Sequence, residues 1–245
     1  MKRALWISLL ATLAFAVILI VRLPALWVAG LLPEGVSCTQ PGGTLWNGSC
    51  NALVVRGMPL GYAAWQLHPA ALLRGKVSAY VDVKRGSDYL RGDLEASSAD
   101  EVLARNLQAE LPLDPALIPQ LPPYLSGHAS VNLPQVRIEN GRVTAVEGQL
   151  EAHDLVNGSQ RMALGSYALR FPKADAGKEP VGELTSLNGP LDVQGTLTLT
   201  REPGFVVEGR VAAGPDASPQ LIQQLGYLGA PDGEGKRPFS LAGTF

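Results

Sequence analysis

Short runs in which apolar and polar residues alternate fill most of the chain after Gly57, and glycines separate them. Alternation with a period of two predicts β-strands, because successive side chains of a strand point to opposite faces. The segment KVSAYVDVKRG at 76–86 places Val77, Val81 and Val83 on one face and Ser78, Tyr80 and Asp82 on the other. The pattern therefore predicts a strand here with one dry and one wet face.

Three longer segments share a plan of glycine, strand, turn, second strand and a late glycine: residues 75–96, 127–152 and 195–213. The glycine intervals differ, so the plan predicts a recurring hairpin and not a strict repeat. The strongest turn among them is Asn140-Gly141, because both residues readily take the positive φ angles of a tight hairpin. The pattern predicts a mainly β fold with a curved, largely antiparallel sheet.

Two helices are expected to interrupt the strands. Ser98 with Glu101 has the spacing of a capping box and predicts a helix over 98–111. Ser218-Pro219 predicts the start of a second helix over 218–229, because proline is tolerated at the first helical position. The proline-rich stretch between them, LPLDPALIPQLPPYLSG at 111–127, predicts an irregular connector and a candidate boundary between sub-sheets near 110–127.

The first residues combine Lys2 and Arg3 with an uncharged, mostly apolar run from Ala4 to Val21. The length fits a membrane-spanning helix better than the shorter apolar region of a cleaved signal peptide. We expect residues 1–4 in the cytoplasm, an anchor over 5–28 and a β-rich domain over 29–245 outside that membrane. The orientation follows because cationic residues flanking a span stay on the cytoplasmic side.

The chain of 245 residues has a formal net charge of −2 and 46% hydrophobic residues. Its length suits one large domain or two small ones. No dense stripe of Lys and Arg with interleaved aromatic residues is present, so the composition argues against nucleic acid as a partner.

The only cysteines, Cys38 and Cys50, lie just beyond the expected anchor. In an oxidising compartment the simplest interpretation is a local disulfide. A redox motif is disfavoured because the spacing is not C-x-x-C, and a zinc site is disfavoured because no histidine or second cysteine pair lies nearby.

Catalytic and metal-binding motifs are not found in the sequence. His68, His128 and His153 stand in separate contexts without metal-ligand spacing. No G-x-S-x-G, P-loop or dinucleotide fingerprint occurs. The acidic pair Asp100-Glu101 is explained by the expected helix start, and Asp88 and Asp93 flank an expected strand. We therefore expect no catalytic residue, no metal and no cofactor.

Four ordered segments carry a resemblance to a known family: LPEGVSCTQPGGTLWNG, PLGYAAWQLHPAALLRGKV, GPLDVQGTLTL and SPQLIQQLGYLGAPDGEGKRPFSLAG. Together they resemble protein N of the bacterial type II secretion system, over the anchor and nearly all of the domain. The most distinctive matching positions are Gly43 to Trp46 with Gly48, and Trp65 with Pro69, Leu72, Leu73 and Gly75. The cysteine pair is not general in that family.

The resemblance implies a non-catalytic inner-membrane protein with one N-terminal span and a periplasmic β-rich domain. It also implies a scaffold or adaptor role between the inner-membrane assembly and the outer-membrane secretin, for export of folded proteins. Its expected partners are the secretin and other secretion proteins; homo-oligomerisation is left open.

Trp46 and Trp65 are the aromatic residues of these motifs. Trp46 is interpreted as an anchor packed at the first corner of the sheet, between glycines that let the backbone turn. The alternative is an exposed indole that binds a partner.

Two other functions stay open. The same anchor and hairpins resemble proteins that form an open β-groove for lipids, and a sheet that curves without closing would provide an apolar trough. An envelope enzyme is the third hypothesis, because a fold can host a site that sequence does not reveal.

Overall fold

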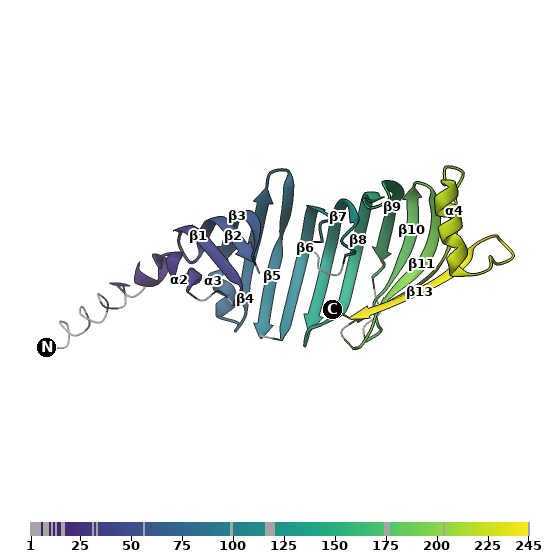
Figure 1. The fold of residues 1–245 in the computed structure, drawn as a ribbon. Helices are drawn as coiled ribbons and strands as arrows, with labels where there is room; N and C mark the ends of the chain where they lie inside the picture. The colour runs from purple at the N-terminus through teal and green to yellow at the C-terminus, as the bar shows by residue number, and fades with distance from the viewer. Residues whose placement is uncertain are drawn as a thin grey trace. The chain divides into compact units, whose positions relative to one another are not determined.

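The computed structural model describes residues 6, 10, 12, 14–15, 18–30, 32, 34–55, 57–98, 100–115, 121–173, 177–202 and 204–244. The chain divides into two compact units, Met1–Arg85 and Gly86–Phe245. Every strand pairing described within each unit is antiparallel, which confirms the mainly β, antiparallel prediction (Figure 1).

The first unit contains four strands that follow one another in the sheet in chain order. Its elements are α2 (Leu26–Ala29), β1 (Val36–Gly43), β2 (Asn47–Val55), β3 (Met58–Leu67), α3 (Pro69–Leu72) and β4 (Val77–Arg85). The one-turn helix α3, between β3 and β4, was not predicted. Pro69 occupies its first turn, where the missing backbone N–H has no helical partner in any case.

The strand at 77–85 is confirmed as β4, but the predicted dry face is wrong. Val77 is 49% exposed, and the side chains on both faces from Ser78 to Val83 are half-buried. Alternation sets which side chains share a face, whereas burial of a face requires a covering layer.

Positions 18–21 of the N-terminal segment are helical, and a turn follows at Arg22. Among the residues that the structure describes, no helix has both the length and the apolar character needed to cross a membrane. Residues 1–5, 7–9, 11, 13 and 16–17 of the predicted cytoplasmic end and anchor lie outside the described part. The anchor over 5–28 therefore stays a prediction.

The second unit contains nine strands, also adjacent in chain order. Its elements are β5 (Asp88–Ser98), β6 (Glu101–Pro112), β7 (Leu125–Glu139), β8 (Arg142–Asn157), β9 (Met162–Phe171), β10 (Val181–Asn188), β11 (Leu191–Leu199), β12 (Gly204–Ala213), α4 (Pro219–Leu225), η1 (Gly226–Leu228) and β13 (Arg237–Thr244). Asn140 and Gly141 form the β7–β8 turn with φ angles of 52° and 72°, as predicted.

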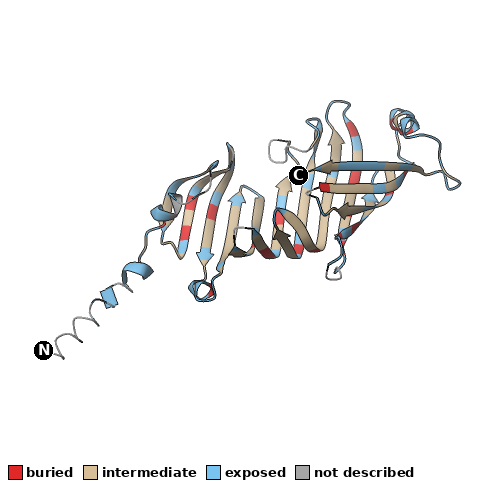
Figure 2. Ribbon diagram, turned by 90° about the horizontal axis from the view of Figure 1, so that it is seen from below, coloured by how far each residue is buried: buried red, intermediate tan, exposed pale blue. Residues whose placement is uncertain are grey.

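The sheet of the second unit twists strongly along its length. In Figure 2 the strand that ends at the C-terminus runs across the direction of the strands at the start of the unit. A right-handed twist between neighbours accumulates in this way over many strands. Buried residues are scattered along the strands, as expected where one layer carries most of the structure.

The helix predicted over 98–111 is wrong, because residues 101–112 form strand β6. Leu103, Leu107 and Leu111 recur every four residues, which resembles a helical stripe. In the structure Asn106 has a φ of 51° and lies in a β-bulge between β5 and β6. The extra residue reverses the alternation, so Leu103 falls on the face opposite to Leu107.

A second bulge lies on β7, next to the bulge of β6. Asn132 and Gln135 pair with Gln149 and Glu147, so Leu133 and Pro134 together oppose Gly148. Proline cannot donate to a strand ladder, and a bulge is where an inner strand tolerates it. With both bulges present, Val136 and Val146 pack in one cluster with Leu133, although Leu103 lies on the other face.

The second predicted helix is confirmed as α4 followed by η1. Ser218 accepts a hydrogen bond from the amide of Leu221 at 3.2 Å, and Pro219 occupies the first turn. Leu221 and Leu225 are buried, and Leu225 joins Val193 and Val211 in a core cluster. The helix therefore covers the last strands of the unit.

The connector at 111–127 joins β6 to its paired neighbour β7, within the second unit. Residues 116–120 of the connector lie outside the described part. The division between the compact units falls at Arg85 and Gly86, upstream of the boundary considered near 110–127.

Candidate interaction surfaces

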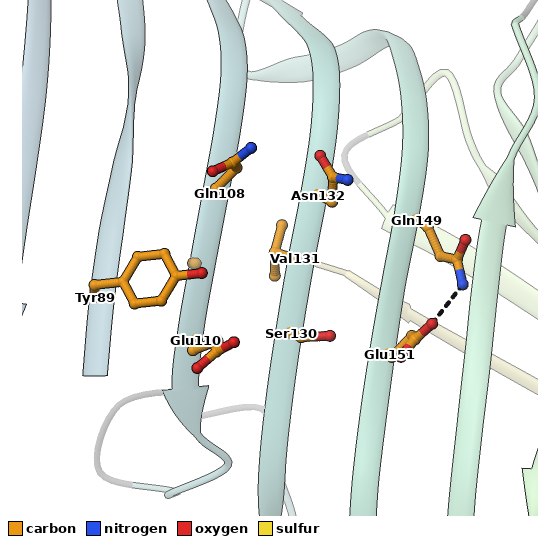
Figure 3. Close-up of a pocket in the computed structure, with 9 residues that line it drawn as sticks. Tyr89, Gln108, Glu110, Ser130, Val131, Asn132, Gln149 and Glu151 are labelled. Atoms are coloured by element: carbon orange, nitrogen blue, oxygen red, sulfur yellow. Dashed lines mark hydrogen bonds between the residues drawn. The ribbon is translucent and has the colours of Figure 1, made fainter. Parts of the chain in front are cut away.

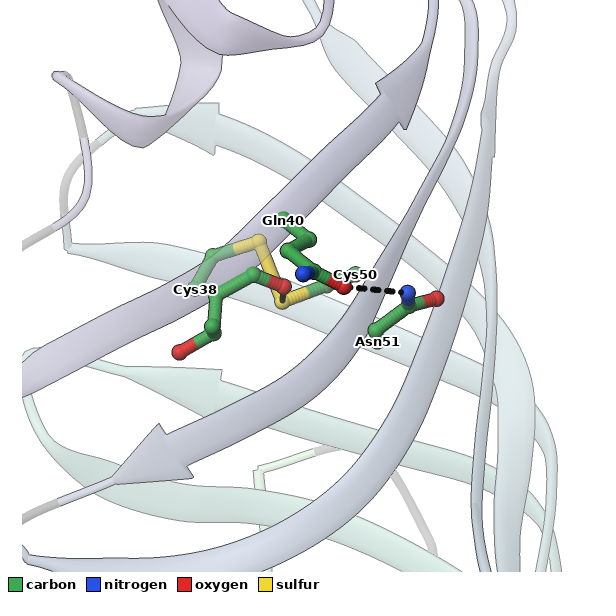
Figure 4. Close-up of a disulfide and its surroundings, with 5 residues drawn as sticks. Cys38, Gln40, Cys50 and Asn51 are labelled. Carbon is green, nitrogen blue, oxygen red and sulfur yellow. Dashed lines mark hydrogen bonds between the residues drawn. A yellow bond between two sulfur atoms is a disulfide. The ribbon is translucent and has the colours of Figure 1, made fainter.

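A disulfide fixes the first corner of the first unit. Cys38 of β1 and Cys50 of β2 are bonded across neighbouring strands, with Cα atoms 5.6 Å apart (Figure 4). Cys50 is 1% exposed, and beside the bond the amide of Asn51 donates to Gln40 at 2.9 Å. The predicted local disulfide is present, and it ties the two strands that lead into the motif Gly43 to Trp46.

Trp65 packs against a glycine in this corner. Gly48 is its partner on β2, and a Cβ at Gly48 would meet the indole at well below contact distance. The Trp65 indole N–H donates to the carbonyl of Leu45 at 3.0 Å. A larger residue at 48 would displace the ring, so the glycine is required by packing.

Trp46 ties the N-terminal segment to the same corner. It is half-buried, and its indole N–H donates to the carbonyl of Ile20 at 2.8 Å. Its own carbonyl accepts from the amide of Leu67 at 2.7 Å. These contacts favour the packed-corner interpretation over an exposed partner-binding indole, and the role of Trp46 in binding stays a prediction.

A row of polar side chains crosses the whole sheet of the second unit. Its members are directly opposed from strand to strand: Arg91, Gln108, Asn132, Gln149, Arg170, Glu183, Thr196, Glu208 and Ser240. The Arg91 guanidinium donates twice to Gln108, at 2.8 and 3.0 Å. Side chains opposed in this way share a face, so one face of this sheet is polar.

A shallow hollow of about 380 Å³ lies on this polar face. Figure 3 shows Tyr89 at one side and the Gln149 amide donating to Glu151 at the other, with Glu110, Ser130 and Asn132 between them. The hollow offers hydrogen-bond donors and acceptors from four strands. Its geometry suits contact with a polar partner surface, without identifying one.

Ser130 and Glu151, which line the hollow, both approach the neighbouring His153. Ser130 Oγ lies 3.4 Å and Glu151 Oε2 lies 2.9 Å from Nε2 of His153. A proton relay needs the hydroxyl and the carboxylate on different ring nitrogens. Both contact the same nitrogen here, so this arrangement is not a catalytic triad.

The sequence suggested that the three histidines stand in unrelated contexts, and this is wrong for two of them. His128 and His153 are directly opposed on β7 and β8, whereas His68 precedes α3 in the first unit. Sequence separation hides this proximity, because register between strands decides which residues meet. Within the described ranges, no three His, Cys, Asp or Glu residues are grouped so as to hold a metal ion.

The acidic residues considered from the sequence have local partners. Glu101 lies 3.3 Å from Arg137, and Asp93 accepts from Asn106 at 3.2 Å. The explanation of Glu101 by a helix start is wrong, because it begins strand β6. Its cross-strand ion pair instead stabilises the β6–β7 pairing.

Two rows of apolar residues lie on the opposite face of the sheet. One row comprises Leu90, Ala109, Val131, Leu150, Leu169, Leu184, Gly195, Gly209 and Phe239. The other contains Leu107, Leu133, Phe171, Leu197, Val207 and Leu241. Its last member, Leu241 on β13, is 60% exposed. Alternation predicted such rows, but their alignment across nine strands depends on register.

Two titratable groups in this unit are perturbed. Burial raises the pKa of Tyr167 to about 12, and its hydroxyl donates to the carbonyl of Leu164. The backbone N–H of Lys236 holds the pKa of Asp232 below its usual value. Desolvation acts in the opposite direction, and the Glu234 N–H and the Arg210 guanidinium lower the pKa further. Both have structural causes, and neither lies in the hollow.

The sheet and its surfaces define the class of this protein: an antiparallel β protein that presents a polar and an apolar sheet face. A sequence profile of the type II secretion system protein N family matches residues 34–240. The type II secretion system protein N of Vibrio cholerae is 30% identical over 99% of both chains, and that of Aeromonas hydrophila is 27% identical over the same share. No solved structure matches.

The chain belongs to the type II secretion system protein N family. It is thus a component of a protein-secretion system, and other secretion components are its expected partners.

Proposed function

We propose that this chain is a non-catalytic adaptor of the type II secretion system. Residues 5–28 anchor it in the inner membrane, its β units lie in the periplasm, and it links the inner-membrane assembly to the outer-membrane secretin. Family membership supports the secretion role, and the same-nitrogen contacts at His153 count against one catalytic alternative.

The observation that carries the adaptor role is the exposed end of an apolar row on β13. Strand β13 pairs with β12 and is last in the strand order, so its outer edge has no strand partner among the described residues. Leu241 continues the row through Leu197 and Val207 and is 60% exposed. A strand added at this edge would extend the row and cover Leu241.

Export by a deletion strain tests the proposal. Without the gene, folded exoproteins accumulate in the periplasm, and the wild-type chain restores their release. Leu241→Lys places a charge where the added strand packs and leaves several-fold more exoprotein in the periplasm. Ser240→Lys, on the opposite face of the same strand, restores release. Unchanged export after deletion rejects the adaptor role, and equal release by both variants rejects the β13 edge.

The apolar rows also favour one alternative, a lipid-handling groove in the periplasm. Leu133, Val146 and Phe171 form a core cluster against which eight further apolar side chains pack, all from the sheet. Acyl chains that remain bound after gentle purification, detected by native mass spectrometry, would support this function. A lipid-free chain that still restores export rejects it. Light scattering of the same sample tests homo-oligomerisation.

A further inference from the structure

The connection between β3 and β4 exposes two leucines on a hydrogen-bonded turn. Leu73 is 91% exposed and Leu72 is 47% exposed. The backbone is closed by hydrogen bonds from Arg74 and Lys76 to the carbonyl of Ala71, at 2.9 and 3.1 Å, and Ala71 itself is buried. The turn is therefore held in a shape that projects the leucines outward. Single exposed leucines are common in proteins, so their surroundings decide whether they matter.

The N-terminal apolar segment ends beside the strand end that carries this turn. The amide of Leu45 donates to the carbonyl of Leu23 at 2.8 Å, and the Trp46 indole donates to Ile20. The Trp46 carbonyl accepts from Leu67, the last residue of β3. A short chain of hydrogen bonds thus connects the end of the apolar segment to the start of the 68–76 connection.

More exposed apolar side chains lie on the N-terminal side of this junction. Leu26 and Trp27 of α2 are 65% and 66% exposed. Tryptophan is enriched where a membrane meets water, because one part of its ring system is apolar and the N–H stays hydrated. The exposed apolar groups therefore gather at the end of the unit from which the apolar segment emerges.

The charge of the two parts of the chain differs in sign. Residues 22–85 carry six Lys or Arg and two Asp or Glu, a net of +4, whereas residues 86–245 carry twelve and twenty, a net of −8. One of the basic residues, Arg74, directly follows the exposed leucines, and Lys76 comes two positions later. Leucines followed by basic residues match a bilayer whose headgroups are anionic.

We propose that the connection 69–76 is a second membrane contact. Leu72 and Leu73 enter the boundary between headgroups and acyl chains, and Arg74 faces anionic phosphates. The contact fixes the orientation of the first unit on the bilayer, which a single span leaves free to rotate. The inference rests on the proposed anchor over residues 5–28.

The test uses the full chain in lipid nanodiscs with a thiol-linked environment-sensitive fluorophore. Leu73→Cys supplies the single free thiol, because Cys38 and Cys50 are bonded to each other. The matched control is Pro59→Cys, an exposed position at the opposite end of β3 and about 26 Å from Leu67 along the strand. Nitroxide on the lipid chains quenches the label at 73 several-fold more strongly than the label at 59.

The lipid composition and a charge variant complete the test. Quenching at 73 is stronger in discs that contain phosphatidylglycerol than in pure phosphatidylcholine, and Arg74→Glu removes the difference. Equal, weak quenching at 73 and 59 in a chain that co-elutes with discs overturns this contact alone. A chain that does not co-elute with discs overturns the anchor as well. Protection of position 73 only after secretion proteins are added overturns the lipid contact in favour of a protein partner.

Discussion

In the part of the chain that the structure describes, four aromatic rings lie over glycines of a neighbouring strand. The pairs are Trp65 with Gly48, Phe171 with Gly182, Phe205 with Gly243, and Phe239 with Gly209. In each pair a Cβ on the glycine would come within 3.0 Å of a ring atom. A glycine in a strand lacks a side chain to pack, and the ring covers the exposed backbone instead. Among the late glycines of the recurring hairpins, Gly209 is explained in this way, whereas Gly92 and Gly148 lie opposite β-bulges.

Gly182→Ala tests this packing without backbone strain. The added Cβ would lie 2.8 Å from Phe171 and 2.9 Å from Leu169, so the ring has to move out of the core cluster. We expect a loss of about 1–3 kcal/mol, the usual cost of overpacking. Thermal unfolding followed by circular dichroism measures it. Gly226→Ala is the control, because nothing lies within 4 Å of its Cβ position; equal melting temperatures of the two variants would contradict the prediction.

Because of Tyr167, the free energy of unfolding is expected to fall as the pH rises in the alkaline range. Burial raises the pKa of Tyr167 from the ordinary value of 10.0 to about 12, so the folded state holds the neutral phenol. Above pH 10, Tyr167 ionises first in the unfolded chain. The stability that its neutral phenol contributes to the folded state is therefore lost as the pH rises through about 12. Tyr167→Phe removes this part of the decline in melting temperature between pH 10 and 12. Tyr227→Phe, at an 85% exposed position, should retain the wild-type slope.

At the scale of elements, the sequence predicted strands and turns better than it predicted bulges. The α4 helix was predicted correctly because Ser218 and Pro219 act locally, through a side-chain cap and a fixed φ angle. The helix predicted over 98–111 is wrong, because the cap pattern at Ser98 precedes strand β6. The alternation of β6 is reversed at Asn106, which makes its apolar residues resemble a helical stripe. That reversal depends on pairing with β5 and β7, which no local pattern contains. The opposition of His128 and His153 was missed for the same reason.

The packing of α4 on the last strands can be tested with two residues of that helix. Leu225 is 8% exposed within the cluster of Val193 and Val211, whereas Ile222 is 49% exposed. Leu225→Ala should leave a cavity and cost about 2–3 kcal/mol in unfolding free energy, near the low end for buried leucines. Ile222→Ala should cost less than half of that. Urea unfolding measures both, and equal losses would show that the helix does not cover the cluster.

At the scale of the molecule, the disulfide and the two-unit division act together. The bond joins β1 to β2 over 12 residues of sequence and lies wholly within Met1–Arg85. Closing a loop of this length restricts the unfolded chain by about 3 kcal/mol in the chain-entropy model. The thirteen strands are divided between two units, because the chain clusters into two sets of internal contacts. Stabilisation by the bond should therefore stay local.

Hydrogen exchange of the Cys38→Ser, Cys50→Ser double variant measures that locality. We expect faster amide exchange in β1 and β2, because the lost constraint lowers the free energy of opening for the first unit. Protection in β7 and β8 should match the wild type, because these strands are held by their own ladder and by the cluster around Leu133. Reducing agent should reproduce the effect in the wild type and leave the variant unchanged. A uniform loss of protection along the chain would show instead that both units unfold as one, and the local stabilisation inferred from the bond's position would then be wrong.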